Sequence, residues 1–413
     1  MREQLPQASF TGLGGSQMEA AGQQRVVKAE DVAVMGLTEI LRHIPHIYAS
    51  YRKLVASIRG ERPDVAVLID FPDVNFRLAK HLRRAGVPVV WFVSPQLWAW
   101  KRRRLRWVQQ RVDKMLVIFP FEETFYQQRG VDAEFVGHPL VGSALMTMSR
   151  EVYAERFQLD PAKTWIALLP GSRWKEIRAN LPALHELAMS DLISSSAAYT
   201  TFDGDTTRQP SDPAAHTRYE FLLPVASTID AAALQKYIGE LNAEHLKYFG
   251  PEASTLRLTL VPDAAEALFH ARASVVASGT ATVLAAIVGN PFVVVYRVSA
   301  LTFALAKKLV EYPEELNAKR DLHGHLPVSM VNLIAQNRLI PELLQGDFTA
   351  ANVASALAPL LIDGPERERQ IRGLHEVRRR LVPVGRAEEP ANASPIARVA
   401  DAVARLLSTV PDA

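Results

Sequence analysis

Short apolar runs alternate with helical patterns along most of the chain. In the first half, apolar runs lie at 65–71, 87–95, 114–120 and 133–139. A second series lies at 165–173, 219–227, 256–261, 273–279 and 290–298. The segments between them, such as FRLAKHLRRAG, space their apolar residues as one face of a helix does. Buried strands that alternate with helices are typical of βαβ units, so the pattern predicts an α/β fold with two parallel sheets.

The boundary between the two sheets is expected near 140–162, after GHPLVGS. Residues 190–217 are rich in Ser, Thr, Asp and Pro and lack periodicity, which predicts a surface loop inserted in the second half. The predicted organisation is a first domain over 1–150, a second over 151–355 and C-terminal helices over 356–413 that pack back on the first domain.

Composition narrows the function classes. The 413 residues are 48% hydrophobic and 22% charged, which allows large cores, and a net charge of +3 is too balanced for a dedicated nucleic-acid-binding protein. The absence of cysteine excludes disulfides, thiolate metal sites and a cysteine nucleophile, and suits a reducing cytosol. No apolar run approaches the roughly 20 residues that span a bilayer.

Two strand-to-helix turns in the second half carry the residues of an anion site. In LPGSRWKEI (169–177) and ASGTATV (277–283), small residues leave backbone N–H groups open at a helix N-terminus, and an arginine can hold phosphate bidentately. Each turn alone is also an ordinary βα connection. Together, at the carboxyl ends of neighbouring strands, they would converge on one diphosphate. The candidate residues are Gly171, Ser172, Arg173, Ser278, Gly279 and Thr280.

One carboxylate in the first half is a candidate general base. LIDFPDVNF ends a buried strand with Asp70, where we expect partial desolvation to suit the carboxylate for proton abstraction. The alternative is a helix N-cap, a role that Asp73 fits better.

Two segments suggest lipid or phosphate contact. In SPQLWAWKRRR (94–104), Trp98 and Trp100 precede a run of cations, which would suit nucleic acid, a phosphate-bearing lipid or a solvated helix face. Residues 32–54 form an amphipathic pattern that either faces a core or rests on a bilayer surface. Its apolar residues include Leu37, Ile40, Leu41 and Ile44.

No metal site is predicted. GHP (137–139) and HGH (323–325) lack partners at metal-ligand spacing. Gly137 and His138 lie instead at the expected hinge between the two halves.

Seven segments, in their order along the chain, resemble the lipid-A-disaccharide synthase family: AVMGLTEIL, IDFPDVNF, VSPQLWAWKRRR, FPFEETFY, VGHP, LPGSR and ASGTATV. The resemblance runs from about residue 13 to the C-terminal helices. It implies an inverting glycosyltransferase of the GT-B type, with two Rossmann-like domains facing across a cleft and no metal or cofactor. The implied reaction joins UDP-2,3-diacylglucosamine to 2,3-diacylglucosamine 1-phosphate, forming a β(1→6) disaccharide 1-phosphate and UDP.

The resemblance also implies roles for individual residues. Asp70 becomes the base for the acceptor 6-hydroxyl, Arg173 a ligand of the donor diphosphate, and Asn332 matches a family asparagine near the donor. Ser278–Thr280 would line the UDP pocket. We expect the acylated, anionic acceptor to contact Trp98, Trp100, Arg102 and Arg103.

The family also implies where the protein works and with what. The apolar segment near 33–47 implies peripheral attachment to the cytoplasmic face of the inner membrane. The implied partners are the UDP-linked donor, the acylated sugar-phosphate acceptor, the membrane surface and a second copy in a homodimer, with no nucleic acid.

Two departures from the family pattern leave alternatives open. The family begins with a strand and a GE(A/S/T)SGD-type loop that are absent here, so Met1 falls within the expected first helix and the first domain is expected to lack its opening strand. Leu284 stands where the family commonly has a glutamate for the donor ribose, and losing such a hydrogen bond costs about 1.5–3 kcal/mol. The alternatives are a truncated or weakly active homologue that only binds nucleotide-sugar, and another transferase that uses UDP-N-acetylglucosamine.

Overall fold

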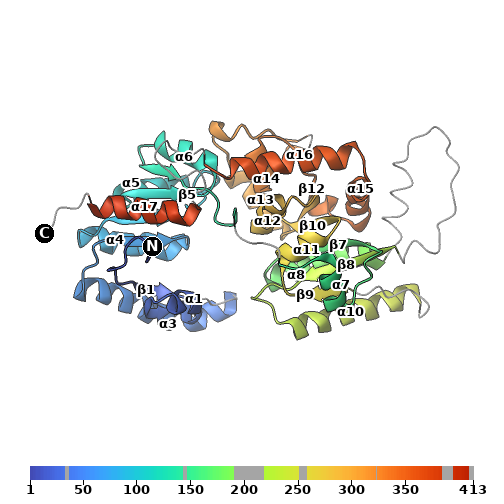
Figure 1. Ribbon diagram of the computed structural model, residues 1–413, viewed down its shortest axis with the longest axis horizontal. Helices are drawn as coiled ribbons and strands as arrows, with labels where there is room; N and C mark the ends of the chain where they lie inside the picture. Colours follow the sequence, from blue (N-terminus) through green and yellow to red (C-terminus); the bar gives the residue numbers. More distant parts are fainter. Residues whose placement is uncertain are drawn as a thin grey trace. The chain divides into compact units, whose positions relative to one another are not determined.

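A computed structural model describes most of the chain, which forms two compact units (Figure 1). One unit comprises Met1–Pro139 with Pro383–Ala413, and the other comprises Leu140–Val382. The described residues are 1–32, 37–142, 147–189, 218–250, 258–321, 323–383 and 394–408, with side chains described outside 32–44. The insertion predicted at 190–217 lies outside these residues.

The first unit is built on a four-stranded parallel sheet with the order β3-β4-β5-β6. Its strands are β3 (Ala66–Ile69), β4 (Val89–Phe92), β5 (Lys114–Val117) and β6 (Ala133–Phe135). The connections are α4 (Pro72–Arg84), the short 3-10 helix η1 (Arg102–Arg104) followed by α5 (Leu105–Arg111), and α6 (Pro120–Gln127). Every residue of β4 is buried because this strand has neighbours on both edges. The sheet predicted from the apolar runs is confirmed.

The N-terminal residues form a small sheet of their own, which the sequence pattern does not predict. Its parallel strands are only four and five residues long, and the register shifts between Gly12 and Leu13, so no clear apolar run marks them. Residues 1–10 form turns, not the helix expected around Met1. The elements are β1 (Thr11–Gly14), α1 (Ser16–Ala20), β2 (Gln24–Lys28), α2 (Ala29–Val32) and α3 (Leu37–Gly60).

Strand β3 lies at the edge of the four-stranded sheet, and within the described residues only β4 pairs with it. Ile69, in its last position, is 43% exposed. The predicted strand at 65–71 is present, but the prediction that it is fully buried is wrong. An edge strand keeps one side of its backbone and part of its side chains in contact with solvent.

The second unit is a doubly wound α/β domain. Its six parallel strands have the order β12-β11-β10-β7-β8-β9, which in order of appearance is 6-5-4-1-2-3. The order reverses between β7 and β10, the topological switch point where such sheets bind ligands. The strands are β7 (Thr164–Leu169), β8 (Tyr219–Pro224), β9 (Leu258–Val261), β10 (Ala273–Ala277), β11 (Phe292–Tyr296) and β12 (Glu342–Leu344).

Helices surround this sheet and bury a large apolar core. They are α7 (Arg150–Phe157), α8 (Trp174–Met189), α10 (Ala231–Phe249), α11 (Ala264–His270), α12 (Thr280–Val288), α13 (Ala300–Leu309), α14 (Met330–Ala335), α15 (Ala350–Leu361) and α16 (Pro365–Arg380). The short 3-10 helices η3 (Glu314–Leu316) and η4 (Gln345–Asp347) complete the unit. Among the described helices, none is both long enough and apolar enough to cross a bilayer.

The C-terminal segment 356–413 divides between the units, which differs from the predicted return of the whole segment to the first domain. Helix α16 stays with the second unit because Leu374 and Val377 are buried there and Gln370 accepts a hydrogen bond from Phe292 N at 2.7 Å. Helix α17 (Pro395–Ser408) belongs to the first unit, where Arg405 pairs with Glu134 at 3.3 Å.

Candidate functional site

The LPGSR turn connects β7 to α8 at the switch point. Gly171 has a φ of +128°, a conformation that favours glycine. Its neighbour Ser172 donates its N–H to the Glu176 carboxylate at 2.9 Å, so this amide is not free, in contrast to the prediction. Arg173 has 73% of its side chain exposed, and among the described residues its guanidinium pairs with Glu176 alone, at 3.3 Å. The guanidinium is therefore the accessible anion-binding group of this turn.

The ASGT turn connects β10 to α12. Gly279 has a φ of +153°, and a Cβ built on it would meet no atom within 4 Å. Helix α12 begins at Thr280 without a side-chain cap, so its N-terminus is open to an anion. Ser278 donates its hydroxyl to Val328 O at 3.0 Å, which ties the turn to the loop before α14.

The fold brings these two turns together. Strands β7 and β10 pair in parallel, with Val276 opposite Leu169, and the two turns follow directly after these paired positions. Both turns therefore leave the same edge of the sheet at the switch point, as predicted. One cation and one open helix N-terminus at a single crevice suit a ligand with two linked phosphates.

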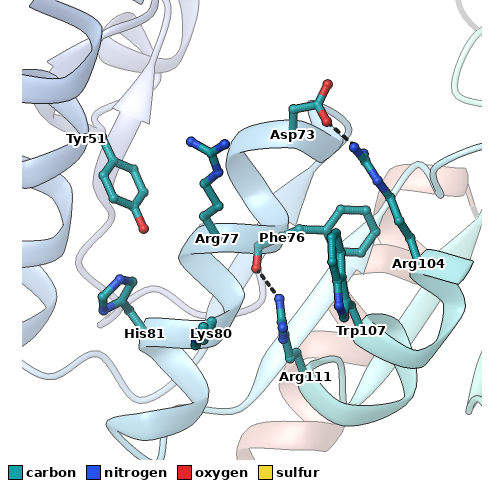
Figure 2. Close-up of a pocket in the computed structure, with 9 residues that line it drawn as sticks. All are labelled: Tyr51, Asp73, Phe76, Arg77, Lys80, His81, Arg104, Trp107 and Arg111. Carbon is teal, nitrogen blue, oxygen red and sulfur yellow. Dashed lines mark hydrogen bonds and ion pairs between the residues drawn. The ribbon is translucent and has the colours of Figure 1, made fainter. Parts of the chain in front are cut away.

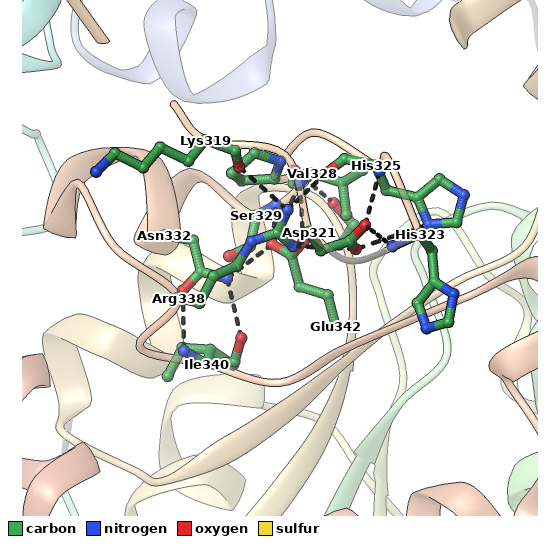
Figure 3. A network of polar contacts seen from close by, with 12 residues as sticks. Lys319, Asp321, His323, His325, Val328, Ser329, Asn332, Arg338, Ile340 and Glu342 are labelled. Carbon is green, nitrogen blue, oxygen red and sulfur yellow. Dashed lines mark hydrogen bonds and ion pairs between the residues drawn. The ribbon is translucent and has the colours of Figure 1, made fainter. Parts of the chain in front are cut away.

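Asn332 is buried in a polar network (Figure 3) that includes Val328, the residue whose carbonyl accepts the Ser278 hydroxyl. Its Nδ2 donates to Ile340 O and to Glu342 Oε1, both at 2.9 Å, and its Oδ1 accepts from Ile340 N at 2.9 Å. These bonds use the amide's donors and its acceptor, so the structure does not present Asn332 to a ligand. Its contacts assign it to holding Ile340 and Glu342, and Glu342 in turn binds the loop that Ser278 contacts.

Glu342 is the centre of that network, and sequence reasoning missed it. Its carboxylate accepts from Ser329 N at 2.8 Å and Val328 N at 3.1 Å, and it pairs with Arg338 at 3.1 Å. Burial raises the pKa of Glu342, although these donors oppose the shift. In the sequence, Glu342 is only a charged residue within a short apolar segment, and this pattern does not indicate which groups it binds.

In the first unit, Asp70 lies on a constrained turn at the end of β3. Asp70 and Phe71 have φ values of +45° and +44°, a region that residues other than glycine rarely occupy. Asn75 stabilises the turn by donating to Ile69 O at 3.2 Å and to Asp70 O at 2.7 Å. A strained, locally braced turn holds the Asp70 backbone in one conformation.

Two predictions about this turn are wrong. Asp70 is exposed, not partly desolvated, because its strand lies at the edge of the sheet. Asp73 is not the N-cap of α4, since Phe71 occupies that position and Pro72 begins the helix. Asp73 lies in the first turn and pairs with Arg104 at 2.7 Å.

The aromatic and basic segment 94–104 divides into a buried part and an exposed part. Trp98 is 2% exposed and donates its Nε1 to Glu122 Oε1 at 3.0 Å, so the prediction that it faces the acceptor is wrong. Trp100 is 46% exposed, with Lys101 Nζ 3.9 Å from its ring centroid. Arg102 and Arg103 are also exposed. Only the second part of the segment can meet a ligand.

Glu122 anchors the buried part. One carboxylate oxygen accepts from Ser94 Oγ at 2.7 Å and from Trp98, and the other accepts from Phe119 N at 3.2 Å. Burial raises the pKa of Glu122 to about 7, and the hydrogen bonds reduce this shift. The motifs SPQLWAW and FPFEETFY are thus joined by one buried carboxyl group.

We expect Glu122→Gln to remove a pH dependence of stability. The folded state holds the Glu122 proton up to about pH 7, whereas an ordinary carboxyl releases it near 4.5. The folded state therefore binds more protons in that window, and the free energy of unfolding falls as the pH rises through it, on the order of 3 kcal/mol for this group. Denaturant unfolding at pH 5 and pH 7.5 measures the difference.

The matched control for this variant is Glu123→Gln, the same change one residue along α6. Glu123 is half-buried and accepts one backbone hydrogen bond, from Phe135 N at 3.0 Å. The control should keep the pH dependence of the unmodified protein. Identical pH dependences in the unmodified protein and in Glu122→Gln would refute the assignment.

The remaining predicted residues are placed only in part. Leu37, Ile40, Leu41 and Ile44 lie in α3, but their side chains are outside the described residues.

His138 is buried against Phe119, with ring centroids 5.7 Å apart, and burial lowers its pKa to about 4. With Gly137 (φ +93°), it immediately precedes the boundary between the units at Pro139. Leu284 is half-buried in α12.

No cluster of three or more His, Asp or Glu that could hold a metal ion occurs among the residues with described positions. Two turns of the second unit carry groups that suit an anion, and the first unit presents the exposed carboxylate of Asp70.

Comparisons with known proteins show the family. A family model described as lipid-A-disaccharide synthetase matches residues 1–201 and 237–392. The lipid-A-disaccharide synthase of Acidobacterium capsulatum is 48% identical over 384 residues, covering 92% of this chain and 86% of that protein. That of Koribacter versatilis is 44% identical over 380 residues, covering 92% and 87%.

Solved structures show the fold. The S. aureus MnaA–UDP co-structure aligns with a TM-score of 0.53 at 12% identity, covering 98% of both chains. The glycotransferase of kitacinnamycin aligns with a TM-score of 0.53 at 13% identity, covering 98% of this chain and 93% of the other. The architecture is that of two Rossmann-like domains of the GT-B type.

Proposed function

This chain belongs to the lipid-A-disaccharide synthase family, and from that premise we propose how it performs glycosyl transfer. The donor is UDP-2,3-diacylglucosamine and the acceptor is 2,3-diacylglucosamine 1-phosphate. The products are the β(1→6) disaccharide 1-phosphate and UDP. The observation that carries this proposal is the pair of anion-binding turns at the switch point of the second unit.

The donor diphosphate binds at these turns. Arg173 supplies an exposed guanidinium, and the open N-terminus of α12 at Gly279 and Thr280 supplies oriented N–H groups. In the structure the Glu176 carboxylate accepts hydrogen bonds from Ser172 N and from the Arg173 guanidinium. A bound diphosphate would take the place of this carboxylate at both donors. Positive groups at this place stabilise the negative charge that develops on the leaving diphosphate, which is the main requirement of the transfer.

The acceptor reacts at Asp70. Its carboxylate takes the proton of the acceptor 6-hydroxyl while that oxygen forms a bond to the anomeric carbon of the donor. The bond from this carbon to the diphosphate breaks, and its electron pair leaves with UDP. Attack on the face opposite the leaving group inverts the configuration. The reaction requires the Asp70 turn and the donor turns to come within reach of the same sugar.

We also propose that the first unit meets the membrane. Trp100, Arg102 and Arg103 combine an exposed aromatic ring with cations, which suits acyl chains beside phosphate. The apolar positions of α3 would add a second contact. The protein would then work as a peripheral enzyme on the cytoplasmic face of the inner membrane, as a homodimer, with Gly137 and His138 at a hinge.

Donor selectivity tests this proposal. We expect the acylated UDP-sugar to give a kcat/KM at least about a hundredfold above that of UDP-N-acetylglucosamine, since each buried methylene of an acyl chain contributes about 0.8 kcal/mol. A preference for UDP-N-acetylglucosamine would favour the other class of transferase. UDP binding without turnover of either donor would favour a homologue that only binds nucleotide-sugar.

A further inference from the structure

The first unit contains a pocket of about 370 Å³ between α3, α4 and α5 (Figure 2). Helix α4 contributes its wall from Asp73 to His81, Tyr51 of α3 lies on one side, and Trp107 of α5 lies on the other. None of the residues assigned above to the donor turns or to the Asp70 turn lines it. The pocket is therefore distinct from the groups assigned to diphosphate binding and to proton transfer.

The pocket carries an excess of positive charge. Four of its lining residues are cations: Arg77, Lys80, Arg104 and Arg111. Asp73, the single carboxylate in the lining, is already paired with Arg104 at 2.7 Å. Within the described part of the chain, no carboxylate pairs with the other three cations. Arg111 donates to a backbone carbonyl, that of Phe76, at 3.0 Å.

Neighbouring groups show the same positive field. The pKa of His81, which also lines the pocket, is lowered by burial and then by three nearby cations, Arg59, Arg84 and Lys80. The pKa of Arg111 is lowered by burial and by Arg106 and Arg84. A bound anion would relieve this repulsion among like charges.

One wall of the pocket is aromatic and rigid. The rings of Phe76 and Trp107 meet edge to face with centroids 5.5 Å apart, and Phe76 also packs on Trp91 at 4.8 Å. The guanidinium groups of Arg104 and Arg111 lie 5.6 and 5.2 Å from the Trp107 ring. An apolar surface beside concentrated positive charge matches a ligand that is apolar at one end and anionic at the other.

We propose that this pocket binds the phosphate group of an acylated ligand, with Arg77 and Lys80 as its principal donors. Its concave shape and volume suit one phosphate with the sugar or glycerol that carries it. A nucleic acid would instead need an extended basic track. Two molecules supply such a phosphate: the acceptor sugar phosphate and an anionic phospholipid of the bilayer. The inference rests on the proposed function only for the first of these sources.

The test compares two double variants of the full chain. Arg77→Gln with Lys80→Gln removes the two pocket cations for which the described residues supply neither an ion pair nor a hydrogen bond. Arg52→Gln with Lys53→Gln is the matched control, because it removes the same charges from exposed positions of α3 outside the pocket. A third variant, Arg77→Lys, keeps the charge and should retain most of the binding.

Three measurements separate the sources of the phosphate. The first is the KM for 2,3-diacylglucosamine 1-phosphate in detergent without phospholipid. The second is binding to phosphatidylcholine vesicles with and without phosphatidylglycerol. The third is calorimetric titration with glucosamine 1-phosphate, which needs no turnover and so remains readable if the proposed function fails.

We expect the pocket variant to weaken at least one interaction by about tenfold relative to the control, the scale of lost charge-assisted hydrogen bonds. A rise in acceptor KM with unchanged vesicle binding identifies the acceptor phosphate. Weaker binding to phosphatidylglycerol vesicles with unchanged KM identifies a phospholipid. If the pocket variant and the control behave alike in all three measurements, the proposal is wrong.

Discussion

Replacing Asp70 with asparagine should lower kcat by about 10²–10⁴, the range associated with loss of a general base. Asparagine keeps the size of the side chain and its hydrogen bond to a hydroxyl, but it cannot take the proton. The KM values for donor and acceptor should therefore change little. The substitution should leave the left-handed turn at Asp70 unchanged, because Asn75 donates to backbone carbonyls and not to the Asp70 side chain. A loss of kcat then reports the loss of the carboxylate.

Asp64→Asn is the matched control for this measurement. Asp64 is also exposed, precedes the same strand and has no assigned role. Steady-state kinetics of both variants, together with thermal unfolding to show that each is folded, separates a catalytic loss from a structural one. If Asp70→Asn keeps kcat within about threefold of the unmodified enzyme, Asp70 is not the base.

Replacing Arg173 with glutamine should lower kcat/KM for the donor by about 10²–10³, comparable to the loss of one oxyanion donor. The guanidinium is exposed and, within the described part of the chain, its one ion pair is with Glu176, so it is available to a diphosphate in the ground state and in the transition state. Because charge on the diphosphate grows as the glycosidic bond breaks, kcat should fall in addition to a rise in donor KM.

Arg178→Gln, within the helix that follows Arg173, provides the comparison. Arg178 is exposed, and its guanidinium lies 5.7 Å from the Trp174 ring. It carries the same charge as Arg173, but it lies inside α8, whereas Arg173 lies in the turn directly before the helix. Equal losses in the two variants would indicate a general electrostatic effect and would contradict a specific diphosphate contact.

The second unit was predictable from the sequence because its signals are local. Apolar runs predict five of the six strands, although not β12 (Glu342–Leu344), and small residues followed by a helical pattern predict the turns after β7 and β10. The order of the strands places these two turns side by side, and a parallel sheet with right-handed crossovers leaves little freedom in that order. Arg173 and Gly279 could therefore be assigned to one crevice from the pattern alone.

Burial and partner choice were less predictable because they depend on residues distant in the chain. Trp98 was expected at the surface, yet it is buried because Glu122, 24 residues away in the chain, accepts its N–H. Asn332 was expected to contact the donor, but its amide is used by Ile340 and Glu342. A single sequence shows that such side chains are polar, not which group satisfies them.

The edge of the sheet in the first unit was the other source of error. The run 65–71 has the composition of a buried strand, and burial was expected to extend to Asp70. Strand β3 instead pairs only with β4 among the described strands, which leaves Ile69 and Asp70 exposed. The apolar pattern predicts a strand but carries no information on the number of its neighbours.

The most direct test of the account is turnover with both acylated substrates and a chelator in place of added metal. The account predicts UDP and β(1→6) disaccharide 1-phosphate in equal amounts from the unmodified protein. It predicts that the Asp70→Asn variant loses most of this turnover. Folded protein that binds UDP but forms no disaccharide from these substrates would contradict it.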